Sequence, residues 1–191
     1  EDEEVIEISN VALDKEYKVS GAGDYVETYV GNLTDGIVGE DLSEGKEAIW
    51  YALYHNGDRP NNAPDKLGYF IIDLEDTYTL TSARVHMTNM TPWGIVPPEA
   101  VTAYVSLDGN AYEEIGSFEG IIADDDFYWV NLENINVKAK YVKIEVKLGG
   151  TFAFVSEVEI YGGKGVAGGS TEEPKEDLEA LLKEALGTAP A

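Results

Sequence analysis

The chain has 191 residues, of which 43% are hydrophobic, and its 37 acidic and 13 basic side chains give a formal net charge of −24. This composition predicts one domain with a packed core and excludes a wholly disordered chain, while the charge disfavours nucleic acid and anionic membrane surfaces as partners. The absence of cysteine excludes disulfides and thiolate chemistry, and no apolar run is long enough for membrane insertion.

Short alternating segments rich in Val, Ile, Tyr and Thr recur along most of the chain. The expected strands are Val5–Ile8, Tyr17–Ser20, Gly68–Leu74, Thr79–Asn89, Ala100–Ser106, Glu113–Gly116, Phe127–Leu132, Tyr141–Lys147 and Phe154–Tyr161. No amphipathic helix separates them, so the pattern predicts an all-β antiparallel sandwich. Asp108-Gly109 lies between two of these strands and predicts a hairpin with a tight primed turn.

Three long segments between the strands have no strand or helix pattern. They are residues 32–46, residues 53–66 and residues 89–98, the last of which carries Trp93 between prolines. Loops of this length in a compact domain are more often functional than accidental. These three segments are therefore the expected location of a binding site.

The composition changes after Tyr161, where five glycines fall within residues 162–170. This stretch predicts a flexible linker. Beyond Pro174, the leucines at 178, 181, 182 and 186 recur at helical spacing, which predicts a short helix. We expect a sandwich domain over 1–162, a Gly-rich linker over 163–171, and a helical tail or the start of another module over 172–191. The opening residues "EDEE" indicate a mature or excised fragment.

Six motifs follow one another in a fixed order in the expected domain. They are "NLTDG" (Asn32–Gly36), Trp50, "GYFIIDLEDTYTLTSARVHM", "VTAYVSLDGNAYEEI", "KAKYVKIEV" and "SEVEIYG". Over residues 5–162 the chain resembles the discoidin family, also called coagulation factor five/eight type C, which includes galactose-binding-like carbohydrate-binding modules. The resemblance implies an eight-stranded jelly-roll sandwich. The segment "KEDLEALLKEAL" is similar to the first helix of small helical modules in large bacterial surface proteins, which implies a secreted or cell-surface protein whose further domains are partners.

The same resemblance implies a structural calcium ion, Ca²⁺, between the Asp35 and Glu157 carboxylates. Calcium takes six to eight oxygen ligands, and a turn with glycine can aim several carbonyls at one point. Further ligands implied by the family spacing are the carbonyls of Asn32, Ile37 and Ser156, with Glu40 in a loop that is longer than usual. The alternative is that these acids, and Glu159 beside them, are solvated surface charges.

Phe152 lies five residues before Glu157, which is the spacing of the aromatic platform in sugar-binding members of the family. The C–H face of a sugar packs on an aromatic ring. The polar side chains that would form hydrogen bonds with the sugar hydroxyls come from one loop. They are His55, Asn56, Asp58, Arg59, Asn61 and Asn62. Trp93 would add a second surface. The alternatives are that Phe152 is a core residue, that His55 and Arg59 only stabilise their loop, and that Trp93 covers the core. We expect Trp50, Trp129 and Phe154 in the core.

The sequence has no recognisable catalytic constellation. Its two histidines, His55 and His86, lack zinc-binding spacing, and there is no nucleophile elbow or phosphate-binding glycine loop. Residues 124–126 read as a charged loop, although paired acids for glycoside hydrolysis stay open. Tyr51 and Asn89 replace the His and Arg of the galactose-binding pattern, so galactose specificity is not supported.

These observations predict a non-catalytic carbohydrate-binding module that prefers neutral to anionic glycans. The alternative is a structural or protein-binding discoidin-like domain for adhesion or spacing, without sugar binding. Loss of glycan binding in Phe152→Ala distinguishes the first reading from the second.

Overall fold

The computed structural model describes residues 6–20, 29–55 and 66–165. The expected linker and helix beyond residue 165 lie outside these ranges. So does the loop that carries four of the expected ligand-binding residues, Asn56, Arg59, Asn61 and Asn62, together with Asp58.

The described residues form nine strands and two short 3-10 helices. The strands are β1 (Ser9–Asn10), β2 (Tyr17–Ser20), β3 (Tyr51–Tyr54), β4 (Leu67–Thr88), β5 (Ala100–Ser106), β6 (Glu113–Glu119), β7 (Phe127–Leu132), β8 (Val137–Lys147) and β9 (Phe152–Gly163). The 3-10 helices are η1 (Glu47–Ile49) and η3 (Thr91–Trp93). In the part of the chain that the structure describes, no helix has the length and hydropathy of a membrane span.

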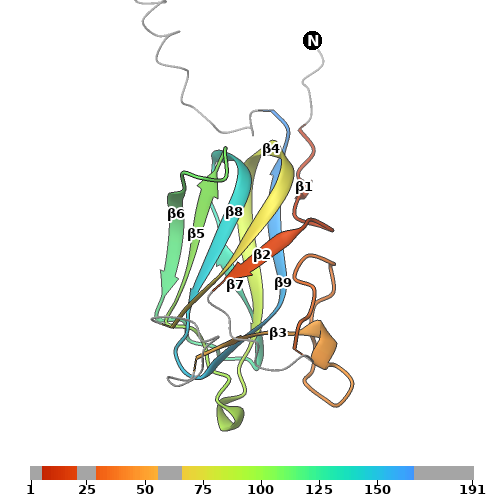
Figure 1. Ribbon diagram of the computed structural model, residues 1–191, viewed down its shortest axis with the longest axis vertical. Helices are drawn as coiled ribbons and strands as arrows, with labels where there is room; N and C mark the ends of the chain where they lie inside the picture. Colours follow the sequence, from red (N-terminus) through yellow and green to blue (C-terminus); the bar gives the residue numbers. More distant parts are fainter. Residues whose placement is uncertain (1–5, 21–28, 56–65, 166–191) are drawn as a thin grey trace, which may run out of the picture.

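Strand β4 joins the two layers of the fold (Figure 1). Its first part pairs with β2 and β8, and β8 continues through β5 to the edge strand β6. Its second part pairs with β7 and β9, and β9 carries β1 and β3 on its other edge. All these pairings are antiparallel, so the predicted all-β antiparallel sandwich is confirmed. The two strands expected at Gly68–Leu74 and Thr79–Asn89 are wrong as separate strands, because β4 is continuous through both.

The core lies between the two layers and follows the alternation of the strands. Phe70 and Ile72 of β4 and Val142 and Ile144 of β8 have no exposed surface, and they belong to one apolar cluster with residues of β9 such as Val158. A second, smaller cluster of Trp50, Ala52, Ile95 and Phe154 packs separately. The core positions expected for Trp50 and Phe154 are confirmed. Because successive side chains point to opposite faces, the residues between the core positions point out of the sandwich.

Several local features differ from the sequence prediction. Residues 6–8 of the strand expected at Val5–Ile8 are not in a strand, and β1 begins at Ser9. Strand β3, which pairs with Phe152–Val155 of β9, was not predicted. The hairpin at Asp108-Gly109 is confirmed, but its connection spans residues 107–112 and is not a two-residue turn. The Asp108 carboxylate shapes this connection, because its Oδ1 accepts hydrogen bonds from the backbone N–H groups of Asn110 at 2.8 Å and Ala111 at 3.0 Å.

Candidate functional site

The turn at residues 32–36 is fixed against the edge of β9. Asn32 Oδ1 accepts a hydrogen bond from the Thr34 N–H at 3.1 Å, as is typical of an Asx turn. Thr34 Oγ1 donates to the Lys15 carbonyl at 2.8 Å. The backbone N–H of Val158 donates to the Leu33 carbonyl at 2.7 Å. These bonds fix the first part of the turn to Lys15 and to β9.

A β-bulge in β9 directs side chains toward this turn. His86 of β4 lies opposite Glu157 and Met87 lies opposite Val155, so Ser156 is the extra residue. Ser156 Oγ accepts a hydrogen bond from the Gly39 N–H at 3.0 Å and lies 2.7 Å from His86 Nδ1. Burial lowers the pKa of His86 to about 4, so its imidazole is neutral at physiological pH.

Glu157 is fully buried beside the turn. Its Oε1 accepts a hydrogen bond from the Gly36 N–H at 3.1 Å, whereas its Oε2 has no hydrogen-bond partner among the described residues. Burial raises the pKa of Glu157 to about 8, and the neighbouring negative charge of Asp35 adds to the shift. A buried carboxylate with an unsatisfied oxygen is unfavourable unless a cation or proton compensates it.

These residues fit the implied calcium ion. Asp35 and Glu157 supply two negative charges, and the unsatisfied Oε2 is the kind of hard oxygen ligand that calcium prefers. Across residues 6–20, 29–55 and 66–165, no three His, Cys, Asp or Glu side chains form a group that could hold a metal. An ion here would therefore depend on backbone carbonyls for its other ligands. Glu40 is exposed and forms no three-carboxylate group with the pair, and its role as a ligand stays a prediction.

For two neighbouring side chains, the alternative of a solvated Glu159 and the expectation of a core Trp129 are wrong. Glu159 is not solvated, since only 9% of it is exposed and its carboxylate accepts hydrogen bonds from Arg84 and from the Tyr161 hydroxyl. Trp129 is not a core residue but is half-buried, with the Arg84 guanidinium 3.9 Å from its ring centroid. Both lie on the outward face of the layer, where the cation of Arg84 compensates the buried acid.

The described parts of the segments expected to form the binding face, at His55, Trp93 and Phe152, lie together at one end of the sandwich. The His55 N–H donates to the Thr151 carbonyl at 2.8 Å, and the Phe152 N–H donates to the Gly94 carbonyl at 3.1 Å. The turn that carries Trp93 therefore lies beside the start of β9, with His55 on the neighbouring strand connection. Figure 1 shows the η3 turn projecting at the end of the molecule where β3 lies.

The aromatic side chains at this end differ in exposure. Trp93 is 61% exposed and is the last residue of η3, which has Pro92 in its first turn and is followed by Gly94 with φ +76°. Phe152 is half-buried, with its ring centroid 5.0 Å from that of Tyr54 and 5.8 Å from that of Phe154. Tyr54, which sequence reasoning missed, supports the Phe152 ring because the two residues are register partners on β3 and β9.

The fold is shared with proteins of known structure. No protein-family model matches the chain, and no curated protein matches it. The chitosan-binding module 1 of a chitosanase/glucanase from Paenibacillus sp. IK-5 is similar over 81% of this chain and 99% of that module, with 16% identity and a TM-score of 0.54. A fucose-binding module from Streptococcus pneumoniae is similar over 80% of this chain and 97% of its own length, with 21% identity and a TM-score of 0.51.

A fucolectin from striped bass serum (Morone saxatilis) has a TM-score of 0.56 and 22% identity, and the match covers 82% of this chain and 49% of that one. All three relationships are similarities of structure at low identity. Together with the antiparallel sandwich described above, they show that this chain has the galactose-binding-like jelly-roll fold of discoidin-type domains.

Proposed function

We propose that this domain is a non-catalytic carbohydrate-binding module whose glycan site lies on the loop end around Trp93, Phe152 and His55. The observation that carries the proposal is the convergence of these three segments through backbone hydrogen bonds, with an exposed tryptophan at their edge. A rigid aromatic side chain that is exposed on a short, hydrogen-bonded turn is suited to stack on the apolar face of a sugar.

The net charge of the chain favours a neutral glycan. A net charge of −24 repels anionic ligands, whereas stacking and hydrogen bonds to hydroxyls are insensitive to it. A single stacking surface with a few hydrogen bonds gives a binding free energy of about −4 to −6 kcal/mol, which corresponds to millimolar to tens-of-micromolar dissociation constants. The similarity of fold to chitosan- and fucose-binding modules supports a glycan ligand without specifying which one.

The proposal includes a structural calcium ion held by Asp35 and Glu157. The ion would supply the positive charge that the buried Glu157 carboxylate lacks. Its other ligands would be backbone carbonyls of the turn and of the bulge, with Asn32, Ile37 and Ser156 as the candidates. Its role would be structural, because it would tie the turn to β9 through residues other than those proposed to contact the glycan.

We further propose that the domain belongs to a larger secreted or cell-surface protein. Weak binding by one module gains strength when other domains of the same polypeptide engage neighbouring sites, since tethering raises the effective concentration. In this setting the module keeps its parent protein on a glycan-coated surface and has no catalytic role of its own.

The test is a glycan array probed with the whole chain, followed by calorimetric titration of the best neutral glycan. Trp93→Ala should abolish or strongly weaken binding. The matched control is Ile122→Ala, because Ile122 is also an exposed apolar residue, at 85%, and lies between β6 and β7. A chain that binds no glycan on the array, or a Trp93→Ala variant that binds as well as the control, would overturn the proposal in favour of a structural or protein-binding domain.

A further inference from the structure

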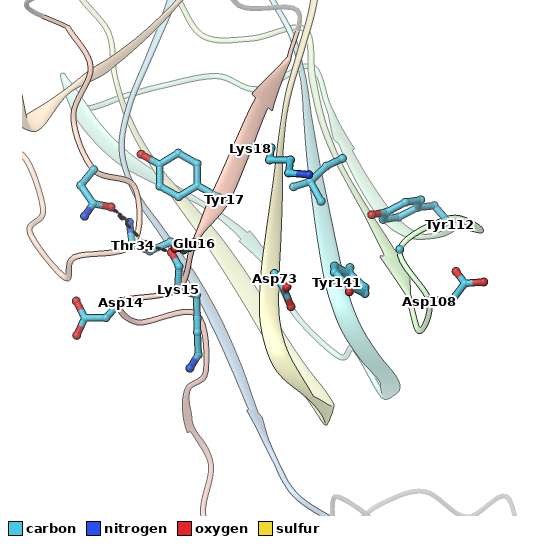
Figure 2. A pocket seen from close by; sticks show the side chains of 13 residues that line it. Asp14, Lys15, Glu16, Tyr17, Lys18, Thr34, Asp73, Asp108, Tyr112 and Tyr141 are labelled. Carbon is cyan, nitrogen blue, oxygen red and sulfur yellow. Dashed lines mark hydrogen bonds between the residues drawn. The ribbon is translucent and has the colours of Figure 1, made fainter.

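A groove of about 850 Å³ lies on the outward face of the layer formed by β2, β4, β8 and β5, away from the loop end. Figure 2 shows Asp73 and Tyr141 side by side on its floor, with Asp108 and Tyr112 on the hairpin at one side. The opposite side is formed by residues 14–17 and by Thr34. None of the residues proposed for the loop-end glycan site lines this groove.

The floor of the groove is rigid because it belongs to the sheet. Asp73 of β4 and Tyr141 of β8 are direct register partners. Ile72 and Val142, one position from each, point into the core, so Asp73 and Tyr141 point outward. The main-chain groups beneath them are paired between the strands. The floor of the groove therefore presents mainly side chains to a ligand.

The hairpin places a second tyrosine beside the first. A Cβ atom at Gly109 would lie 3.2 Å from the Tyr141 ring, so the backbone of the connection rests close to that ring. Burial raises the pKa of the Tyr112 hydroxyl, and the nearby Tyr141, Asp108 and Asp73 raise it further. The phenol rings of Tyr112 and Tyr141 and the carboxylates of Asp73 and Asp108 therefore lie close together in the groove.

Both carboxylates are held in place by hydrogen bonds. Asp108 Oδ1 accepts hydrogen bonds from Ser106 Oγ and from two backbone N–H groups, and these bonds lower the pKa of Asp108. Asp73 Oδ1 accepts a hydrogen bond from the Glu75 N–H at 2.8 Å. In the described part of the chain, the hydrogen bonds to both carboxylates therefore use Oδ1.

The other charges around the groove leave it negative. Its remaining lining residues include the carboxylates of Asp14 and Glu16 and the ammonium groups of Lys15 and Lys18. Lys15 Nζ is paired with Glu75 at 2.8 Å, which leaves Lys18 as the lining cation without an ion pair among the described residues. An anionic ligand is thus disfavoured, and a ligand with positive groups is favoured.

We propose that this groove is a second glycan-binding surface, which takes a linear oligosaccharide of amino sugars with free primary ammonium groups. Tyr112 and Tyr141 would contact the sugar rings, while Asp73 and Asp108 would accept hydrogen bonds from the ammonium groups. Carboxylates and phenols match the hydroxyls of a sugar, whereas a basic peptide would also need partners for its backbone, which the paired strands of the floor do not offer. The surface shares no residue with the loop-end site and does not depend on that site.

The test is calorimetric titration of the whole chain with a glucosamine hexamer, with the fully N-acetylated hexamer and hexalysine as comparison ligands. The glucosamine hexamer should bind most tightly and its affinity should fall with salt. Asp73→Asn keeps the acceptor for the Glu75 N–H but removes the charge, and Tyr112→Ala removes a ring. Each should weaken binding by about 3- to 10-fold. The matched control is Asp124→Asn, which makes the same charge change in an exposed loop.

Three other outcomes would overturn the inference. Equal affinity for the N-acetylated hexamer would contradict recognition of the ammonium groups, and equal affinity for hexalysine would contradict recognition of sugar. Binding that is lost in Trp93→Ala but unchanged in Asp73→Asn would assign the ligand to the loop end. If Tyr112→Ala fails to fold, Asp73→Asn with an unchanged melting temperature still decides the outcome.

Discussion

Gly36 and Glu157 are 121 positions apart in the sequence, yet the Gly36 N–H donates a hydrogen bond to Glu157 Oε1 at 3.1 Å. This bond satisfies one oxygen of a fully buried carboxylate and leaves Oε2 without a partner among the described residues. The negative charge of the Glu157 carboxylate is therefore not compensated by this contact between turn and strand. A proton or a cation can compensate that charge, and the two differ in their pH dependence.

The first prediction concerns stability against pH in chelator. The pKa of Glu157 is about 8 in the folded protein, against an ordinary value of 4.5, so the folded state binds more protons between these values. The free energy of unfolding should therefore fall as pH rises from about 4.5 to 8, by about 2–4 kcal/mol for this group. Denaturant unfolding at several pH values measures the change.

His86 has the opposite effect at lower pH. Its pKa of about 4 lies below the ordinary value of 6.5, so its contribution to stability is present above pH 6.5 and is lost as pH falls toward 4. The interval from pH 6.5 to 8 therefore isolates Glu157. In Glu157→Gln the fall in that interval should vanish, and an unchanged slope in this variant would assign the effect to another group.

The second prediction is that calcium stabilises the domain. At a thousandfold excess of calcium over its dissociation constant, the free energy of unfolding should rise by about 4 kcal/mol. The gain should grow with pH, because the ion competes with the proton on Glu157. Asp35→Asn and Glu157→Gln should each abolish it, while Asp124→Asn, an exposed acid elsewhere, should not. Identical melting curves in calcium and in chelator would contradict the site.

The sandwich was predictable because alternating apolar and polar residues indicate strands with one buried face, and turn residues mark the ends of those strands. Strand β3 was missed since Ala52, Leu53 and Tyr54 are all buried, and a strand that is buried on both faces does not alternate. The continuity of β4 was missed because Glu75 and Asp76 resemble a turn, whereas they lie where the strand passes from one layer to the other. A local sequence pattern indicates which side chains are exposed, but it does not indicate that one strand continues from one layer into the other.

The sites depend on contacts that the sequence does not display. Solvation was the simplest reading of Glu159 in so acidic a chain, because its partner Arg84 is 75 residues away. The groove could not be predicted for the same reason, because its lining residues come from four separate segments. They include Tyr17, Asp73, Tyr112 and Tyr141. The meeting of the loops at Phe152 and Trp93 followed from the family resemblance, whereas the half-burial of Phe152 against Tyr54 did not.

The third prediction separates the two aromatic residues at the loop end. Trp93→Ala should lower glycan affinity by about 1–3 kcal/mol and change stability by less than about 0.5 kcal/mol, because its side chain is largely exposed. Phe152→Ala should lower both affinity and stability, the latter by about 1–3 kcal/mol, because its ring packs against Tyr54 and Phe154. Titration and urea unfolding of both variants measure the difference. A Phe152→Ala variant that loses stability but binds normally would leave Trp93 as the platform.

The last prediction concerns the ion pair on the outward face of the β4–β9 layer. Arg84 lies over the Trp129 ring and donates a hydrogen bond to the Glu159 carboxylate. Only 9% of Glu159 is exposed. Arg84→Met keeps much of the packing on Trp129 but leaves the acid without its cation, and should cost about 2–4 kcal/mol of stability. Adding Glu159→Gln removes the uncompensated charge, so the double variant should recover most of the loss. Urea unfolding of the two single variants and the double variant gives the coupling energy. A double variant no more stable than Arg84→Met would mean that packing on Trp129, and not charge compensation, accounts for the effect of Arg84.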